Sequence, residues 1–174
     1  GDHGPGVVRV RGFDPGQLGI SRDVLESHYC LQIAVLDNKC IKELEKEYVF
    51  KHFDVETHGK VKTIKKWREL PSLEVKPPDI YRYFVRVKDK SLDAFIRKNK
   101  LKKMDRSLAE DEFVFQNSVR INNQYYTSLG KQRAFVISQG RNMMVLKIVG
   151  YAEDVVSYYM MDDFKAHVWI AHQR

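Results

Sequence analysis

Side chains that could carry out catalysis are few and scattered in this sequence of 174 residues. Asp79 follows two prolines, and Asp163 and Lys165 form an acid-x-lysine pair. Two acids and a lysine could hold a divalent metal and orient a water, as in a nuclease. These groups lie 84 residues apart, however, and the pattern around Asp163 predicts a helix rather than a sheet strand.

Other catalytic signatures are missing. His167 and His172 are five positions apart, so they cannot share a helix face as metal ligands at i and i+4 do. The sequence contains no phosphate-binding loop, dinucleotide fingerprint, zinc-protease motif or serine-hydrolase motif. It therefore predicts no cofactor and no metal, and it favours a non-catalytic protein over an enzyme.

Positive charge is concentrated in one quarter of the chain. Residues 60–106 contain sixteen lysines and arginines against six acids, a net charge of +10, whereas the whole chain carries +7. The other 127 residues therefore sum to about −3. Phosphate contacts release condensed counterions and so provide affinity for nucleic acid of any sequence. A lysine-rich face that serves solubility is the competing interpretation.

Two parts of this basic segment could contact nucleic acid. Residues 81–87 alternate in the manner of a strand with arginines on one side, and an amphipathic helix capped by Ser91 follows, with cations over its C-terminal half. Upstream, Trp67 stands among cations, where it could stack on a base or anchor a loop to the core. The predicted nucleic-acid-binding residues are Lys65, Lys66, Trp67, Arg68, Arg82, Arg86, Arg97, Lys98, Lys100, Lys102 and Lys103.

The same features allow a second function from a different class. A basic face attracts an acidic protein as well as a phosphate backbone, and an aromatic surface can take an extended peptide. The sequence thus predicts an RNA-binding or DNA-binding domain, with a protein-interaction module as the alternative.

The expected fold is α+β, with an N-terminal helical hairpin packed on a mainly antiparallel C-terminal sheet. Helical spacing from Val24 to Leu36, with Ser21 as N-cap, predicts the first helix, although a strand over 28–36 competes. Apolar spacing from Ile41 to Phe53 predicts the second.

The C-terminal part is expected to be rich in strands. Alternation over 113–121 predicts a strand that turns at 122–123, and two further strands are expected to pair around the turn at 139–142. A strand is also predicted over 6–13, a helix from 153, and a strand or helix continuation over 167–171.

Domain organisation and location complete the expectations. Residues 1–6 are glycine-rich and predicted to be disordered, and 7–174 are predicted to form one domain or two packed halves joined by a proline-rich connection near 70–79. Cys30 and Cys40 form no disulfide framework, which indicates a reducing compartment. Without an apolar stretch of about 20 residues, no membrane segment is expected. We therefore expect an intracellular protein of the nucleus or cytoplasm.

Overall fold

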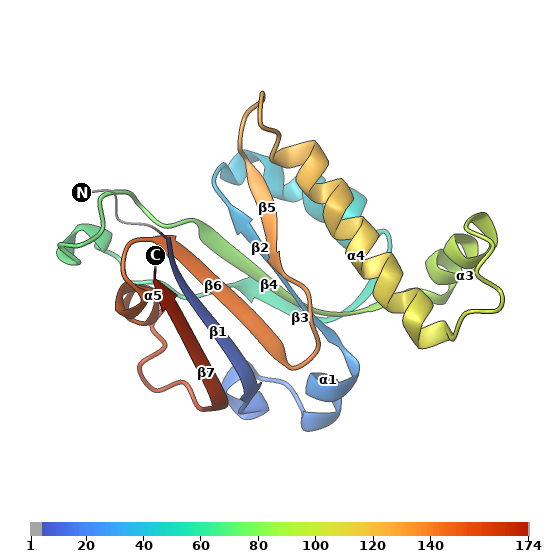
Figure 1. Cartoon of the computed structure of the whole chain (residues 1–174), viewed down its shortest axis with the longest axis horizontal. Helices are drawn as coiled ribbons and strands as arrows, with labels where there is room; N and C mark the ends of the chain where they lie inside the picture. Colours follow the sequence, from blue (N-terminus) through green and yellow to red (C-terminus); the bar gives the residue numbers. More distant parts are fainter. Residues whose placement is uncertain (1–4, 174) are drawn as a thin grey trace.

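A computed structural model describes residues 5–173, which form two antiparallel sheets and several helices (Figure 1). The elements are, in chain order, β1 (Pro5–Phe13), η1 (Pro15–Leu18), α1 (Arg22–Ser27), β2 (Tyr29–Val35), η2 (Asn38–Cys40), α2 (Ile41–Leu44), η3 (Glu45–Phe50), β3 (Phe53–Lys60), η4 (Trp67–Glu69), β4 (Asp79–Val87), α3 (Asp89–Lys98), α4 (Arg106–Tyr125), β5 (Ala134–Ser138), β6 (Met143–Val149), α5 (Ala152–Tyr158) and β7 (Ala166–Gln173). The α+β class predicted from the sequence is confirmed.

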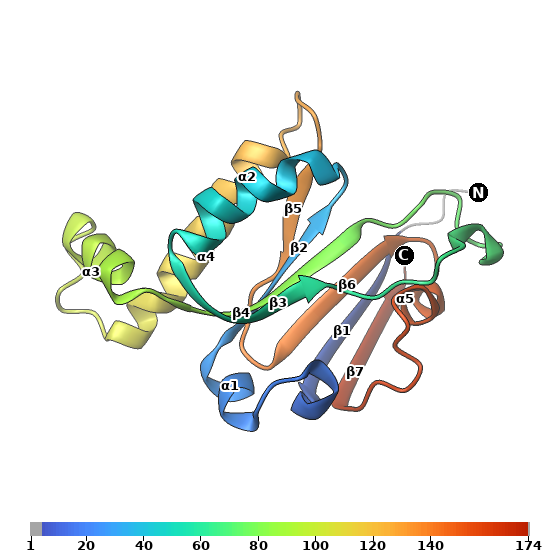
Figure 2. The same cartoon turned by 180° about the vertical axis from the view of Figure 1, so that it is seen from behind.

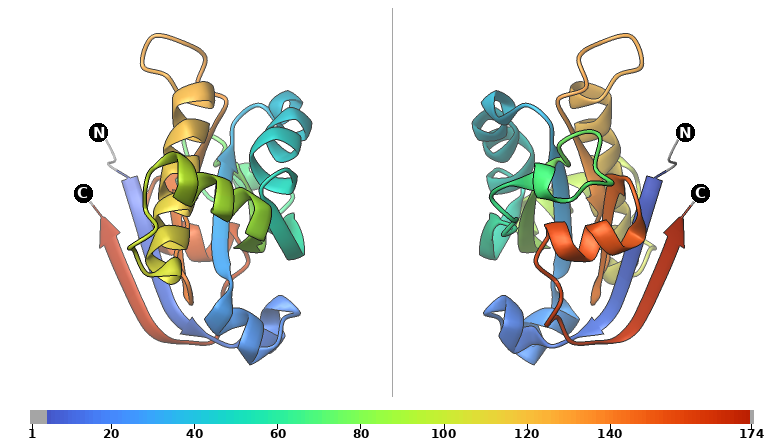
Figure 3. Two further views of the ribbon diagram at one scale, coloured as in Figure 1. Left: turned by 90° about the vertical axis from the view of Figure 1, so that its right-hand side faces the viewer. Right: turned by 90° about the vertical axis from the view of Figure 1, so that its left-hand side faces the viewer.

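Each sheet combines strands from the N-terminal and the C-terminal parts of the chain. One sheet has the strand order β3-β4-β2-β5, and the other has the order β6-β1-β7. Every pairing is antiparallel. The first strand, β1, lies between two strands from the C-terminal end, and β1 and β7 are seen as the blue and dark red strands on the outer side in Figure 3.

Two apolar cores lie on opposite faces of the four-stranded sheet. On one face α2, η3 and α4 pack against β2 and β4, and Tyr48 meets Tyr125 edge to face with their ring centroids 5.9 Å apart. On the other face Cys30 and Phe84 pack with the three-stranded sheet and α5. All seven residues of β2 are buried, because this central strand is covered on both sides.

The predicted N-terminal helical hairpin is wrong. The first element is a strand, and residues 29–35 form β2 rather than a helix, so the competing strand interpretation was the right one. Only α1 remains of the first predicted helix, with Ser21 accepting from the Val24 amide as the predicted cap. The second predicted helix exists as α2 and η3, but it ends at Phe50, and β3 follows.

The predicted strand and hairpin at 113–123 are also wrong, because these residues lie within the 20-residue helix α4. Phe113 and Ile121 are buried, but Phe115 and Val119, which would share their face in a strand, are exposed. The buried positions instead recur at helical spacing and include polar residues such as Glu110 and Asn117.

Most of the remaining elements agree with the sequence. Strands β1, β4, β5, β6 and β7 and helix α5 lie where they were predicted. Helix α3 begins at Asp89 after an N-cap at Lys88, so Ser91 is not its cap. β5 and β6 are not paired with each other, since β5 pairs with β2 and β6 pairs with β1.

Three further expectations concern the chain as a whole. Residues 1–4 of the predicted disordered tail lie outside the described residues, whereas Pro5 and Gly6 belong to β1. The proline-rich connection near 70–79 lies between η4 and β4, and β2 before it pairs with β4 after it. Within residues 5–173, no helix has the length and apolar character needed to cross a membrane.

Candidate nucleic-acid interface

The C-terminal end of α3 and the loop to α4 project from the body of the protein (Figures 1 and 2). This projection carries five cations within seven residues, which we call the basic tip: Arg97, Lys98, Lys100, Lys102 and Lys103. All five are exposed. The tip is anchored by Leu92, which is buried, and by Phe95, whose ring meets that of Phe113 edge to face at 5.4 Å.

The backbone of the basic tip is held by a helix C-cap. The Leu101 amide donates to the Ile96 carbonyl at 2.9 Å, and the Asn99 side chain donates to the Phe95 carbonyl at 2.8 Å. Lys100 adopts a left-handed conformation with φ of 56°, at a position where glycine is usual. A lysine here costs conformational energy relative to glycine and adds a cation to the tip.

The charge of the basic tip is not neutralised by the protein. Among residues 5–173, no acid forms an ion pair with any of the five cations. The neighbouring Arg106 differs, because it contacts Asp89 at 2.9 Å and Asp93 at 2.8 Å. A helix C-terminus attracts cations through its dipole, but that accounts for only some of the five.

The two predicted arginines of β4 do not join the basic tip. Arg82 and Arg86 share one strand face with Phe84, as predicted, but the second sheet covers part of that face. Arg86 makes a bidentate pair with Glu110, with both N–O distances at 3.0 Å, and this hydrogen bonding raises the pKa of Arg86. Arg82 donates to Gln32 and lines a pocket elsewhere on the molecule.

The predicted residues Lys65, Lys66, Trp67 and Arg68 lie at the opposite end of the molecule from α3, in and beside the green helical turn η4 of Figure 1. Trp67 is half-buried and packs against the second core, while the Arg68 guanidinium lies 4.7 Å from the centre of its ring. Lys66 pairs with Glu69 at 3.5 Å. This cluster and the basic tip therefore cannot form one continuous surface.

Sequence reasoning missed a partly buried polar network at the base of the projection. Tyr29 donates to Asp111 and accepts from Arg141 at 2.8 Å, and Arg141 also approaches Glu110 at 3.7 Å. Burial raises the pKa of Tyr29, so its hydroxyl stays protonated. These residues come from β2, α4 and the loop before β6, and no local motif connects them.

Asp79 and Asp163 were considered as metal ligands, and neither belongs to a group of metal-binding side chains within residues 5–173. Asp79 contacts Lys60 at 3.1 Å and accepts from the Asn38 amide at 3.2 Å. Asp163 is exposed in the segment after α5. The described part of the chain contains no group of three histidine, cysteine or acidic side chains that could hold a metal ion.

Comparison with known proteins gives little functional information. No protein-family model matches the chain. An uncharacterized protein of Archaeoglobus fulgidus is 30% identical over 99 residues, which is 56% of this chain. The matched region spans only 21% of that archaeal protein.

Proposed function

We propose that this chain is a non-catalytic nucleic-acid-binding domain that contacts phosphates with its basic tip. The observation that carries the proposal is the clustering of unpaired charge. The five cations of the tip lie within seven residues, are all exposed and have no acidic partner among residues 5–173, whereas the nearby Arg86 and Arg106 are each paired with an acid. Unpaired, projecting cations can reach the phosphates of RNA or DNA and release counterions.

The shape of the region supports this assignment. The basic tip extends beyond the body of the protein, so a nucleic acid can approach it without meeting the sheets (Figure 2). The cap at Lys100 fixes the backbone, which lowers the entropy lost when the tip is ordered on a ligand. The tip presents no aromatic side chain, which favours phosphate contacts over base stacking.

An acidic protein partner is the second candidate. Met104 and Leu108, beside the basic tip, have exposed fractions of 41% and 58%. Exposed apolar side chains next to cations would suit a protein surface better than a phosphate backbone.

For either function we also propose an intracellular location, in the nucleus or cytoplasm. Two buried cysteines that form no disulfide support this location.

A titration with labelled single-stranded and double-stranded RNA and DNA at low salt tests the proposal. The first variant combines R97E, K98E, K100E and K103E, and it should lose binding to every nucleic acid that the wild type binds. Its fold should persist, because exposed charges usually change stability by less than about 0.5 kcal/mol each.

The matched control reverses four exposed lysines outside the basic tip, K42E, K46E, K131E and K147E. Both variants lower the net charge by 8, so the control separates a local site from a general charge effect. Equal loss of affinity in the two variants would argue against the tip. Failure of the wild type to bind any of the four nucleic acids would favour the acidic protein partner.

A further inference from the structure

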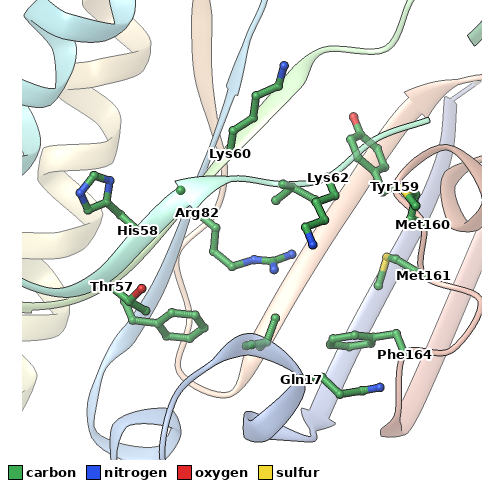
Figure 4. Close-up of a pocket in the computed structure, with 14 residues that line it drawn as sticks. Gln17, Thr57, His58, Lys60, Lys62, Arg82, Tyr159, Met160, Met161 and Phe164 are labelled. Carbon is green, nitrogen blue, oxygen red and sulfur yellow. The ribbon is translucent and has the colours of Figure 1, made fainter. Parts of the chain in front are cut away.

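A pocket of about 340 Å³ lies where β3 and β4 meet η1 and the segment after α5 (Figure 4). Its lining contains Arg82, Lys60 and Lys62 but no aspartate or glutamate. Lys60 and His58 point away from the central space in Figure 4, and Lys60 is paired with Asp79 at 3.1 Å. The other two cations of the lining, Arg82 and Lys62, point their charged groups into the central space.

Arg82 is fixed by uncharged groups. Its Nε donates to Gln32 Oε1 at 2.9 Å, and its Nη2 lies 3.5 Å from the sulfur of Met144. Gln32 is fully buried, and its amide nitrogen donates to Ser138 Oγ at 3.1 Å and to the Val145 carbonyl at 2.8 Å. Both sheets thus hold the guanidinium in one position.

This arginine has no acidic partner in the part of the chain that the structure describes. Burial lowers the pKa of Arg82, and an arginine nevertheless stays charged in a protein. Arg86 lies four residues further along on the same strand face, and it donates two hydrogen bonds to the carboxylate of Glu110. The Arg82 guanidinium is half-buried and faces the pocket, where no carboxylate of the described residues reaches it. A partly desolvated charge without a partner is unfavourable, so the contrast with Arg86 indicates that the counter-ion of Arg82 is supplied from outside.

The walls of the pocket define the rest of the ligand. Phe84 and Phe164 supply aromatic rings, and Met161 and Leu18 add apolar surface. The guanidinium fork of arginine matches the oxygens of a phosphate, and aromatic walls accept a flat ring. The volume is at the lower end of that of small-molecule sites, which suits a ligand of mononucleotide size.

We propose that this pocket binds a nucleoside phosphate, with the phosphate between Arg82 and Lys62 and the base against the aromatic wall. The ligand is either a free nucleotide or the phosphorylated end of an oligonucleotide. The site does not depend on the basic tip, because the two share no residue.

Calorimetric titration of the whole chain with adenosine monophosphate, adenosine and inorganic phosphate tests the site. The monophosphate should bind about 10- to 100-fold more tightly than adenosine, because only the phosphate makes charge-assisted hydrogen bonds. A 5′-phosphorylated and a 5′-hydroxyl trinucleotide distinguish the two sources. Tighter binding of the phosphorylated trinucleotide than of the monophosphate assigns the site to a nucleic-acid end, and the reverse order assigns it to a free nucleotide.

Two variants localise the binding. R82M removes the guanidinium and should abolish binding. It also leaves the buried Oε1 of Gln32 without its donor, so the melting temperature of the ligand-free protein should fall by about 2–12 °C while circular dichroism shows that the fold persists. K62Q is exposed and should fold normally while weakening binding about tenfold. K65Q, three residues further along and outside the pocket, should bind as the wild type does.

The results that would overturn the proposal are specific. One is a wild-type protein that binds neither the monophosphate nor the phosphorylated trinucleotide at millimolar concentration. Another is equal binding of adenosine and its monophosphate, and a third is unchanged binding by K62Q. Variants of the basic tip should leave monophosphate binding intact, so failure of this site and failure of the tip can be told apart.

Discussion

Replacing Glu110 by alanine should destabilise the protein strongly, because this carboxylate is the buried centre of a charge network. Its exposed fraction is 3%. It accepts two hydrogen bonds from Arg86 at 3.0 Å and one from the Val87 amide at 3.2 Å. Arg141 approaches it at 3.7 Å.

The size of the effect follows from what the variant leaves behind. Removing one partner of a buried ion pair costs about 3–5 kcal/mol, and a buried amide without an acceptor costs about 1–3 kcal/mol. Arg86 and Arg141 have exposed side-chain fractions of 47% and 32%, so both can recover part of their hydration. We therefore expect a loss of about 2–4 kcal/mol, which in a chain of this size lowers the melting temperature by about 4–16 °C.

Urea denaturation followed by circular dichroism measures this loss. The control is Glu69→Ala, which removes a carboxylate from an exposed pair with Lys66 at 3.5 Å. That pair should contribute less than about 1 kcal/mol. If the two alanine variants were equally stable, the reasoning about the Glu110 network would be refuted.

Three other expectations follow from buried or half-buried side chains. Trp67→Ala should lower the free energy of unfolding by about 1.5–2.5 kcal/mol, roughly half the cost for a fully buried tryptophan, without changing nucleic-acid affinity. Burial raises the pKa of the Cys30 thiol to about 11 and also raises the pKa of Cys40, so a thiol reagent at pH 8 should label neither until denaturant is added. Burial lowers the pKa of His28 and His52 below the ordinary value of 6.5, so the unfolded chain takes up protons more readily. Stability should therefore fall as the pH drops below about 6.5, and glutamine at both histidines should flatten that dependence.

The fold was predictable where one period dominated the sequence. In β4 the alternation of Tyr83 and Val85 with Arg82 and Phe84 indicated the strand and its two faces correctly. In α4 the alternation of large apolar residues fitted a strand, while the buried polar residues Glu110, Asn117 and Ser118 concealed the helical stripe. Tertiary contacts with Arg86 and with the Tyr48 carbonyl stabilise Glu110 and Asn117, and no local pattern predicts such contacts. Ser118 instead donates to the Val114 carbonyl within the helix.

Strand pairing depended on long-range contacts in the same way. β5 and β6 are joined by four residues, which favours a hairpin. The connection instead passes from one sheet to the other, with Asn142 in a left-handed conformation and the Cys30 amide donating to the Gly140 carbonyl. β5 pairs with β2 and β6 pairs with β1, and each partner lies more than 90 residues away in the sequence.

The candidate sites were predictable only in part. The cations of the basic tip are adjacent in the sequence, so composition revealed them. Residues far away in the sequence decide whether a cation has an acidic partner. Arg86 meets the carboxylate of Glu110, whereas Arg82 meets the uncharged side-chain amide of Gln32. The pocket at Arg82 combines η1, β3, β4 and the segment after α5, and the sequence predicted no strand where β3 lies.

The salt dependence of nucleic-acid affinity tests the central claim most directly. If all five cations of the basic tip neutralise phosphates, the logarithm of the association constant should fall linearly with the logarithm of salt concentration, with a slope of about −3.5 to −4.5. Each lysine of the tip changed to glutamine should reduce that slope by about 0.7–0.9. The account would be contradicted if the wild type bound neither RNA nor DNA at low salt, or if the tip variants kept the wild-type slope.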